Sequence, residues 1–531
     1  MDKLSEKNVI FKTQKSVDLL ILLIYLILLI TLTIAQLKAF QNPIFKSGKR
    51  VKWWISGVSL YMYYLTIDQG QLLTGIIAEH GMSGMWFIWA SWIGVFVIPL
   101  VFAPLWRKMD FMTDNQFLLF RYPGKSGWFL YQFRAIYVGG FVVTLALCFH
   151  LIGFARIAAF YFDISQENAL LLTGGILCVF ALKNVFDLKL KMDVLHAILF
   201  FVSLAVIVFS LWNLEGSKEA FFTFFKAHPE KKSLFPTNEN TWFSLLVFLG
   251  IQWWSCNLFD GSGPEMTRFT AVKDTKSAIL TGLVPIAVSF LVSFIMIGHI
   301  LLILGLKNNY VNPEFHYVES VFQVVPKVMK PIVLLGFFGM FITTAEPLMK
   351  WGASLFTIDV VKGNFHPTLS EKQEKKISFG TMIFLSLLAV IFAFYIGNLQ
   401  SLIKLIFSIS AGVAPVYILR WIWFRINAWS QLSAMLSSAV FTLLYPSFHT
   451  YLLFSNYPLQ ESRVVVVTLL TTCVWVIVTL LTPSQSTEVR LKMLPIVESR
   501  MIFIRRFTIA ILLGIVFLGI VALSWYLLLN N

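Results

Sequence analysis

Long apolar segments separated by short polar loops recur along the whole chain of 531 residues. Each segment is close to the roughly 20 residues that a helix needs to cross the hydrocarbon core of a bilayer. The pattern predicts fourteen membrane-spanning helices, at 17–38, 53–78, 84–105, 129–156, 168–186, 192–213, 241–259, 277–306, 329–360, 376–396, 400–424, 428–446, 463–482 and 502–528. We therefore expect an all-α polytopic membrane protein.

Two of these spans contain polar and glycine positions where a continuous membrane helix would be apolar. The second span includes YYLTIDQGQLLTG, with Asp68 and Gln71 in its middle, and the seventh includes GIQWWSCNLFDGSG. They are the first helices of two five-span halves, about 53–213 and 241–425. Because five is odd, the two halves would cross the membrane in opposite directions. Interrupted helices at matching positions of inverted repeats indicate a transporter that binds its substrate near the bilayer midplane.

The spans divide the chain into three expected parts. These are an N-terminal tail, extra helix and basic cytoplasmic loop (1–52), the inverted-repeat transporter core (53–425) and three C-terminal accessory helices (426–531). Lys and Arg are more frequent in the loops that face the cytoplasm if the N-terminus lies outside. The basic tail that holds Lys3 and Lys15 favours the opposite orientation. We expect a multi-pass plasma-membrane protein with both termini outside the cytoplasm.

The composition agrees with a membrane protein and excludes other classes. Apolar residues make up 58% of the chain and charged residues 13%, whereas soluble domains carry about 25% charged residues. The net charge of +15 lies in short loops between spans, which argues against a nucleic-acid partner. The four cysteines lack the spacing of a metal site, and no catalytic motif is present. We expect no enzymatic activity, no organic cofactor and no obligate protein partner.

The ninth span holds a cluster of polar residues in the stretch TTAEPLMK. A single threonine in a membrane helix commonly returns its hydroxyl to a carbonyl one turn earlier. Pro347 has no N–H, however, so the carbonyl of Thr343 loses its helical donor beside the hydroxyl of Thr344. Such a neutral oxygen cluster suits a hard cation such as Na⁺. Glu346 and Lys350, four residues apart, predict an ion pair along the helix.

Asp68 is the most informative residue of the second span, because a carboxylate inside a membrane helix indicates function. It can cap the helix at the break, or it can contact an ion or a substrate. If Asp68 carries a proton, the chain is an H⁺-coupled symporter. A protein that binds a solute without coupling would instead be a channel or a sensor. The sequence leaves these interpretations open.

Five stretches combine charged, aromatic and proline positions in distinctive patterns. They are APLWRKMDFMTDNQFLLFRYPG (103–124), MTRFTAVKDTKSAILTGL (266–283), SLFTIDVVK (354–362), LRWIWFRINAWSQLSAM (419–435) and LLTPSQSTE (480–488). All five resemble motifs of the sodium:solute symporter family, which includes sodium-coupled carriers of sugars, proline, sialic acid and pantothenate. The resemblance implies a LeuT-like inverted-repeat core that works by alternating access.

The resemblance also implies roles for individual residues. Aligned on SLFTIDVVK, it places Na⁺ ligands at the hydroxyls of Thr343 and Thr344 and at the carbonyl of Met340. It places partner carbonyls in the second span at Tyr64 and Ile67. The implied substrate contacts are Gln69, Gln71, Trp253 and Asn257, and Asp193 resembles the family's aspartate near the inner ion exit. We add Asp68 to the expected substrate contacts because of its place in the interrupted second span.

Three residues depart from the family pattern. Glu346 and Pro347 stand where the family usually has small or hydroxylated residues, and Asp68 stands where many members have serine. We expect a secondary transporter that couples Na⁺ to the symport of a small organic solute across the bilayer. The polar uncharged side chains near the breaks favour a sugar-like solute.

Overall fold

The computed structural model is helical throughout the residues that it describes, namely 51–109, 111–181, 186–255, 260–306, 312–396, 399–451 and 454–530. The first predicted span, 17–38, lies outside them. Helices satisfy every backbone hydrogen bond within one segment, which is why apolar chains adopt them in lipid. The prediction of an all-α membrane protein is therefore confirmed.

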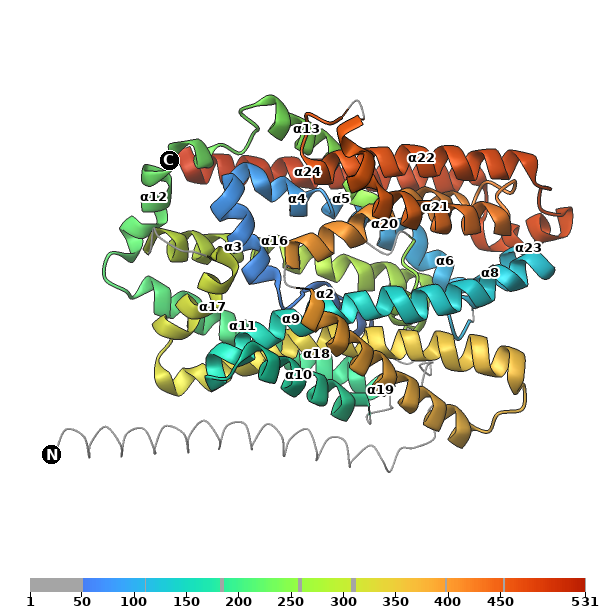
Figure 1. The fold of residues 1–531 in the computed structure, drawn as a ribbon, viewed down its shortest axis with the longest axis horizontal. Helices are drawn as coiled ribbons and strands as arrows, with labels where there is room; N and C mark the ends of the chain where they lie inside the picture. The colour runs from blue at the N-terminus through green and yellow to red at the C-terminus, as the bar shows by residue number, and fades with distance from the viewer. Residues whose placement is uncertain are drawn as a thin grey trace.

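The long helices lie nearly along one direction (Figure 1). The first part of the chain forms α2 (Trp53–Tyr64), α3 (Gln69–His80), α4 (Trp86–Trp89), α5 (Trp92–Val97), α6 (Ala103–Lys108), α7 (Gln116–Arg121), α8 (Lys125–Ile136), α9 (Val143–Phe162), α10 (Gln166–Ala181), α11 (Phe186–Trp212) and α12 (Ser217–Ala227). The second part forms α13 (Glu239–Val247), α14 (Trp253–Ser255), α15 (Pro264–Thr270), α16 (Thr275–Leu306), α17 (Pro313–Val324), α18 (Lys330–Ser354), α19 (Glu371–Tyr395), α20 (Leu399–Leu419), α21 (Ala428–Phe448), α22 (Leu459–Leu481), α23 (Thr487–Val497) and α24 (Arg500–Asn530).

Each predicted span from the second to the fourteenth corresponds to one or two of these helices, except the third, which covers α4, α5 and the start of α6. Within the described ranges, nine helical stretches are long and apolar enough to cross a membrane. The apolar pattern did not predict the short helices α7, α12, α17 and α23, because they are too short to span. Local signals explain α17: the side chain of Asn312 accepts from the N–H of Phe315, and Pro313 follows the cap.

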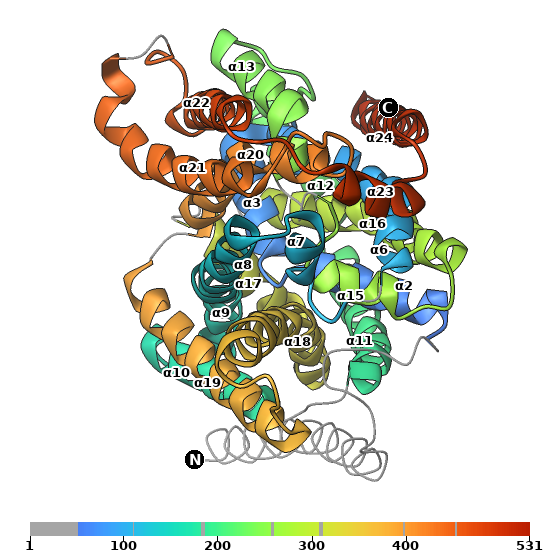
Figure 2. The same ribbon diagram turned by 90° about the vertical axis from the view of Figure 1, so that its right-hand side faces the viewer.

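The contacts between helices repeat across the two halves of the core. Helix α9 packs against α19, and its counterpart α18 packs against α10. Likewise α11 contacts α18 while α20 contacts α9, and α2 contacts α16 while α14 contacts α5. In Figure 2, α9, α10, α18 and α19 lie together on one side, and α20, α21 and α22 lie on the other. Each of these contacts of a helix in one half with a helix in the other half thus has an equivalent with the halves interchanged, as expected for an inverted repeat.

The five stretches that resemble family motifs are joined by buried and partly buried hydrogen bonds, which we call the motif network. The bonds join Arg107 to the carbonyl of Val272 (2.6 Å), Thr113 to the carboxylate of Asp359 (2.8 Å), Arg121 to the carbonyl of Arg420 (2.8 Å) and Asn427 to the carbonyl of Pro483 (2.9 Å). The sequence motifs therefore have a structural role, because they hold loops from both repeats together.

A buried ion pair lies beside this network. The guanidinium of Arg420 donates to the carboxylate of Asp260 at 2.7 Å, and both side chains are at most 1% exposed. Trp421 donates to the same carboxylate at 2.9 Å, and Trp106 donates to the backbone carbonyl of Asp260 at 2.6 Å. Asp260 thus connects the second interrupted helix to two distant segments.

We predict that Asp260→Asn strongly destabilises the protein, because it leaves the Arg420 guanidinium buried without a counter-charge. The expected loss is about 3–5 kcal/mol, measured by thermal unfolding of the purified protein in detergent. Glu488→Gln is the control, since Glu488 forms an exposed pair with Lys492 and its loss should leave the unfolding temperature unchanged. Equal stability of Asp260→Asn and the wild type would contradict the prediction.

Candidate solute and sodium site

The first interrupted helix is broken at residues 65–68. Helix α2 ends at Tyr64, and α3 begins at Gln69. The prediction that polar residues interrupt this span is therefore confirmed. The last carbonyls of α2 and the first N–H groups of α3 have no partners within a helix. Inside a membrane, such groups are tolerated only where they meet other protein groups, an ion or a polar cavity.

The second interrupted span is also discontinuous. Helix α14 ends at Ser255, and α15 begins at Pro264. Between them, Gly261 and Gly263 have φ values of 68° and 69°, a conformation that favours glycine. Asn257, an expected substrate contact, lies outside the described residues.

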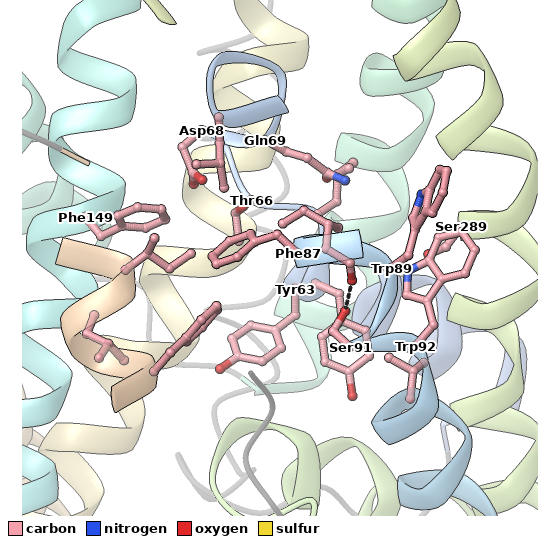
Figure 3. Close-up of a pocket in the computed structure, with 18 of the residues that line it drawn as sticks. Tyr63, Thr66, Asp68, Gln69, Phe87, Trp89, Ser91, Trp92, Phe149 and Ser289 are labelled. Atoms are coloured by element: carbon pink, nitrogen blue, oxygen red, sulfur yellow. Dashed lines mark hydrogen bonds between the residues drawn. The ribbon is translucent and has the colours of Figure 1, made fainter. Parts of the chain in front are cut away.

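A cavity of about 380 Å³ lies against the first break (Figure 3). The residues labelled in Figure 3 are Tyr63, Thr66, Asp68, Gln69, Phe87, Trp89, Ser91, Trp92, Phe149 and Ser289. They come from the break, from α2, α3, α4, α5, α9 and α16, and from Ser91 between α4 and α5, and further lining residues come from α18, α20 and α24. A cavity of this size with a largely apolar wall and a few polar groups is typical of a small-molecule site.

The structure places the expected substrate residues in different surroundings. Asp68 and Gln69 line the cavity. The amide of Gln71 is instead buried and donates to the carbonyl of Gly153 at 3.0 Å, which joins α3 to α9. Trp253 packs edge-to-face against Trp254, with ring centroids 5.4 Å apart. Gln71 and Trp253 therefore pack within the protein rather than line this cavity.

Several lining residues were not expected from the sequence. The rings of Tyr63, Phe87, Trp89 and Trp92 form much of the wall that Figure 3 shows. No local signal distinguishes them, because the chain contains 51 Phe and 17 Trp, most of which serve packing.

Asp68 occupies the N-cap position of α3, but its side chain makes no capping hydrogen bond. The helix-cap interpretation is therefore not supported. The side chain is 1% exposed, and neither carboxylate oxygen has a hydrogen-bond partner of good geometry among the described residues. Thr66 is a neighbour within the break, and Nδ1 of His150 lies 3.9 Å away. Burying a carboxylate without hydrogen-bond partners lowers the stability of the fold unless another group or a ligand compensates its charge.

Thr343 and Thr344 are fully buried on α18. The hydroxyl of Thr343 donates to the carbonyl of Gly339 at 2.8 Å, and that of Thr344 to the carbonyl of Met340 at 3.0 Å. These are the one-turn contacts of an ordinary membrane threonine. Thr343 additionally contacts the carbonyl of Met62 on α2 at 3.1 Å. This second contact joins α18 to the helix that breaks.

The oxygen atoms around Thr343 have the chemistry of a sodium site. Met62 lies in the last turn of α2, where carbonyls lack a helical donor, and Met340 presents its carbonyl to both threonines. Neutral hydroxyl and carbonyl oxygens suit a hard monovalent cation. The family resemblance placed the α2 ligands at Tyr64 and Ile67, whereas the α2 carbonyl that contacts Thr343 is that of Met62. The roles of Tyr64 and Ile67 stay predictions.

Two further expectations concern charged residues near the site. The predicted pair of Glu346 and Lys350 is confirmed, with 2.7 Å between Oε1 and Nζ and both side chains buried. Asp193 on α11 is bonded to Lys189 at 2.6 Å and accepts from the hydroxyl of Ser59 on α2. Asp193 therefore contacts the helix that breaks, and its role in ion exit stays a prediction.

Comparison with known proteins places these features in a family. The model of the sodium:solute symporter family matches residues 44–438, which is most of the chain. The chain belongs to this family. The symporter has no significant match among curated protein sequences.

A solved structure shows the same fold. A Na⁺-coupled sialic acid symporter in a substrate-bound outward-open state matches with a TM-score of 0.70 and 15% identity, over 88% of this chain and 99% of that one. A nucleobase-cation-symport-1 family transporter in a closed conformation matches with a TM-score of 0.46 and 13% identity, over 86% and 98%. The match to the sialic acid symporter structure confirms the expected LeuT-like core, and at 15% identity the likeness concerns the fold alone.

We predict that Asp68→Asn does not destabilise the ligand-free protein. The substitution keeps the shape of the side chain and removes an uncompensated buried carboxylate, so stability should stay equal or rise by about 1–3 kcal/mol. Thermal unfolding in detergent, beside Asp260→Asn, measures the contrast. A large loss of stability in Asp68→Asn would mean that the carboxylate has a structural partner after all.

Proposed function

We propose that the symporter binds Na⁺ where α18 crosses α2 and a small organic solute in the adjoining cavity, and that it moves both by alternating access. The observation that carries the proposal is the contact of the Thr343 hydroxyl with the Met62 carbonyl. It supports an ion site at the last turn of α2, and Asp68 in the break and Gln69 at the start of α3 line the cavity. One discontinuous helix would then respond to both ligands.

The coupling follows from this shared helix. An ion bound between α2 and α18 would hold the end of α2 in place and so fix the part of the break that faces the solute. A solute in the cavity would in turn stabilise the ion-bound conformation, because linkage between two binding sites is reciprocal. Release of the ion would free the break and weaken binding of the solute.

The driving force is sufficient for concentrative uptake. One charge that crosses about 100 mV releases about 2.3 kcal/mol, and a tenfold Na⁺ gradient adds about 1.4 kcal/mol. Together they would concentrate a neutral solute roughly 500-fold at one-to-one coupling.

The sugar-like solute expected from the sequence has limited support. It rested on Gln69, Gln71, Trp253 and Asn257, of which Gln69 lines the cavity. Thr66, Ser91 and Ser289 add hydroxyl groups to the wall. We therefore retain a small polar organic solute as the proposal.

We further propose the plasma membrane as the location, with both termini outside. In that orientation the motif network lies at the cytoplasmic end, and Asp193 takes part in the inward exit of the ion. Reaction of a terminal tag with a membrane-impermeant reagent on intact cells tests the orientation.

Thr343→Ala and Thr344→Ala should weaken Na⁺ binding, because each removes a hydroxyl ligand. We expect the apparent Na⁺ affinity for solute uptake into proteoliposomes to fall about tenfold or more in each variant. Thr343→Ser, which keeps the hydroxyl, should retain most of the affinity.

Thr173→Ala on α10 is the matched control. Thr173 is also fully buried and donates one turn back, to the carbonyl of Ala169 at 2.7 Å, but it lies away from α2. Unchanged Na⁺ affinity in both site variants, or an equal loss in Thr173→Ala, would refute the site.

The unpartnered carboxylate of Asp68 favours a second candidate, H⁺-coupled symport. Uptake driven by a Na⁺ gradient at equal pH on both sides separates the two. The Na⁺ proposal requires full transport under that condition, whereas H⁺ coupling requires a pH gradient.

A further inference from the structure

The cavity has a charge opposite to that of the chain as a whole. The protein carries a net charge of +15, but two carboxylates, Asp68 and Glu265, line the cavity. Among the described residues that line it, there is no Lys or Arg. His150 is the basic side chain in the wall. The charge of the cavity therefore favours a positively charged occupant.

The two carboxylates are not equivalent. Glu265 is near the guanidinium of Arg268 and accepts a hydrogen bond from the hydroxyl of Tyr64, so the protein already compensates part of its charge. Asp68 has no cation of its own in contact: the closest basic atom is Nδ1 of His150 at 3.9 Å, and Arg156, whose charge also acts on Asp68, is already paired with Glu314 at 2.6 Å. Asp68 is thus the carboxylate whose charge the protein leaves for a ligand.

The hydrogen-bonding atoms of the wall point to a ligand that donates. Buried acceptors without a partner among the described residues are both carboxylate oxygens of Asp68, Oε1 of Gln69 and Oε2 of Glu265. Trp89 Nε1 is an unpartnered donor, and the hydroxyl of Tyr61 and Nδ1 of His150, which can donate or accept, also lack a partner among the described residues. In Figure 3, Asp68 lies on the Phe149 side of the cavity, while Gln69 extends toward the two tryptophans. A buried acceptor is costly to leave unpaired, so a solute with N–H groups fits this wall better than an anion.

The aromatic wall adds a second attraction. Tyr63, Phe87, Trp89, Trp92 and Phe149 line the cavity beside Asp68. Aromatic faces attract organic cations through their quadrupoles, most strongly where water is excluded. A cavity of about 380 Å³ is also far larger than a bare metal ion.

We propose that the transported solute is an organic ammonium ion and that Asp68 is its counter-ion. The proposal rests on the proposed function, which it makes more specific. The ammonium group donates to the Asp68 carboxylate, and the aromatic rings surround its alkyl part. A carboxylate solute would face Asp68 with like charge, and a sugar would leave the charge of Asp68 uncompensated.

The test measures thermal shifts of the full-length protein in detergent, in NaCl and in KCl. The probes are methylammonium, tetramethylammonium, ethanolamine, choline and putrescine. Their matched neutral compounds include ethylene glycol for ethanolamine and 3,3-dimethylbutan-1-ol for choline, and glucose, acetate and proline complete the panel. We expect at least one ammonium probe to raise the unfolding temperature in NaCl, and its neutral match to have little effect.

Asp68→Asn should weaken binding of that probe about tenfold or more, because the counter-charge is lost, and with it a charge-assisted hydrogen bond for the probes that carry N–H groups. Glu374→Gln is the matched control. Glu374 pairs with Lys362, is as buried as Glu314 and lies outside the cavity wall, so its variant should bind like the wild type. Size-exclusion profiles of the ligand-free variants confirm that both are folded.

The outcomes separate this inference from the proposed function. A Na⁺-dependent shift with a neutral or anionic solute, and none with the ammonium probes, overturns the ammonium class and leaves the symporter intact. An ammonium shift of equal size in NaCl and KCl supports the class and contradicts sodium coupling. No shift with any ammonium probe, an undiminished ammonium shift in Asp68→Asn, or a Na⁺-only shift that Asp68→Asn abolishes, would each overturn the role of Asp68.

Discussion

The function of this symporter depends on one constraint, which is that polar backbone groups inside a membrane must find partners. Helix α2 ends at Tyr64 and α3 begins at Gln69, so groups that a continuous helix would satisfy are released in the middle of a span. At the end of α2, the hydroxyl of Thr343 contacts one of these backbone groups, the carbonyl of Met62. At the start of α3, Asp68 and Gln69 face a cavity. The break thus creates both candidate sites.

The rest of the fold keeps this break in place. The α9–α10 and α18–α19 pairs pack against each other in an exchanged order, and α11 contacts both α2 and α18. The motif network and the buried pair of Asp260 and Arg420 join segments of both repeats. Rigid packing around a discontinuous helix lets small ligands select between arrangements, because packed interfaces do not deform continuously.

Much of the fold could be predicted from the sequence, because its signals are local. Apolar runs located the helices, polar residues located the first break, and a four-residue spacing identified the pair of Glu346 and Lys350. The cavity wall was harder to predict, because it depends on which faces of distant helices meet. Gln71 and Trp253 have suitable chemistry but pack elsewhere, and the α2 carbonyl that contacts Thr343 is that of Met62. The spacing of apolar residues along the sequence does not tell which way a side chain points at a helix break.

Hydrogen exchange of the purified protein in Na⁺ and in K⁺ is the most direct measurement of the proposed coupling, because it needs no knowledge of the solute. If Na⁺ binds between α2 and α18, exchange of backbone amides at residues 62–72 and 339–346 should be slower in Na⁺ than in K⁺. Amides at 169–181 on α10 should not respond. Identical exchange in the two salts at both segments would contradict a sodium site at the helix break.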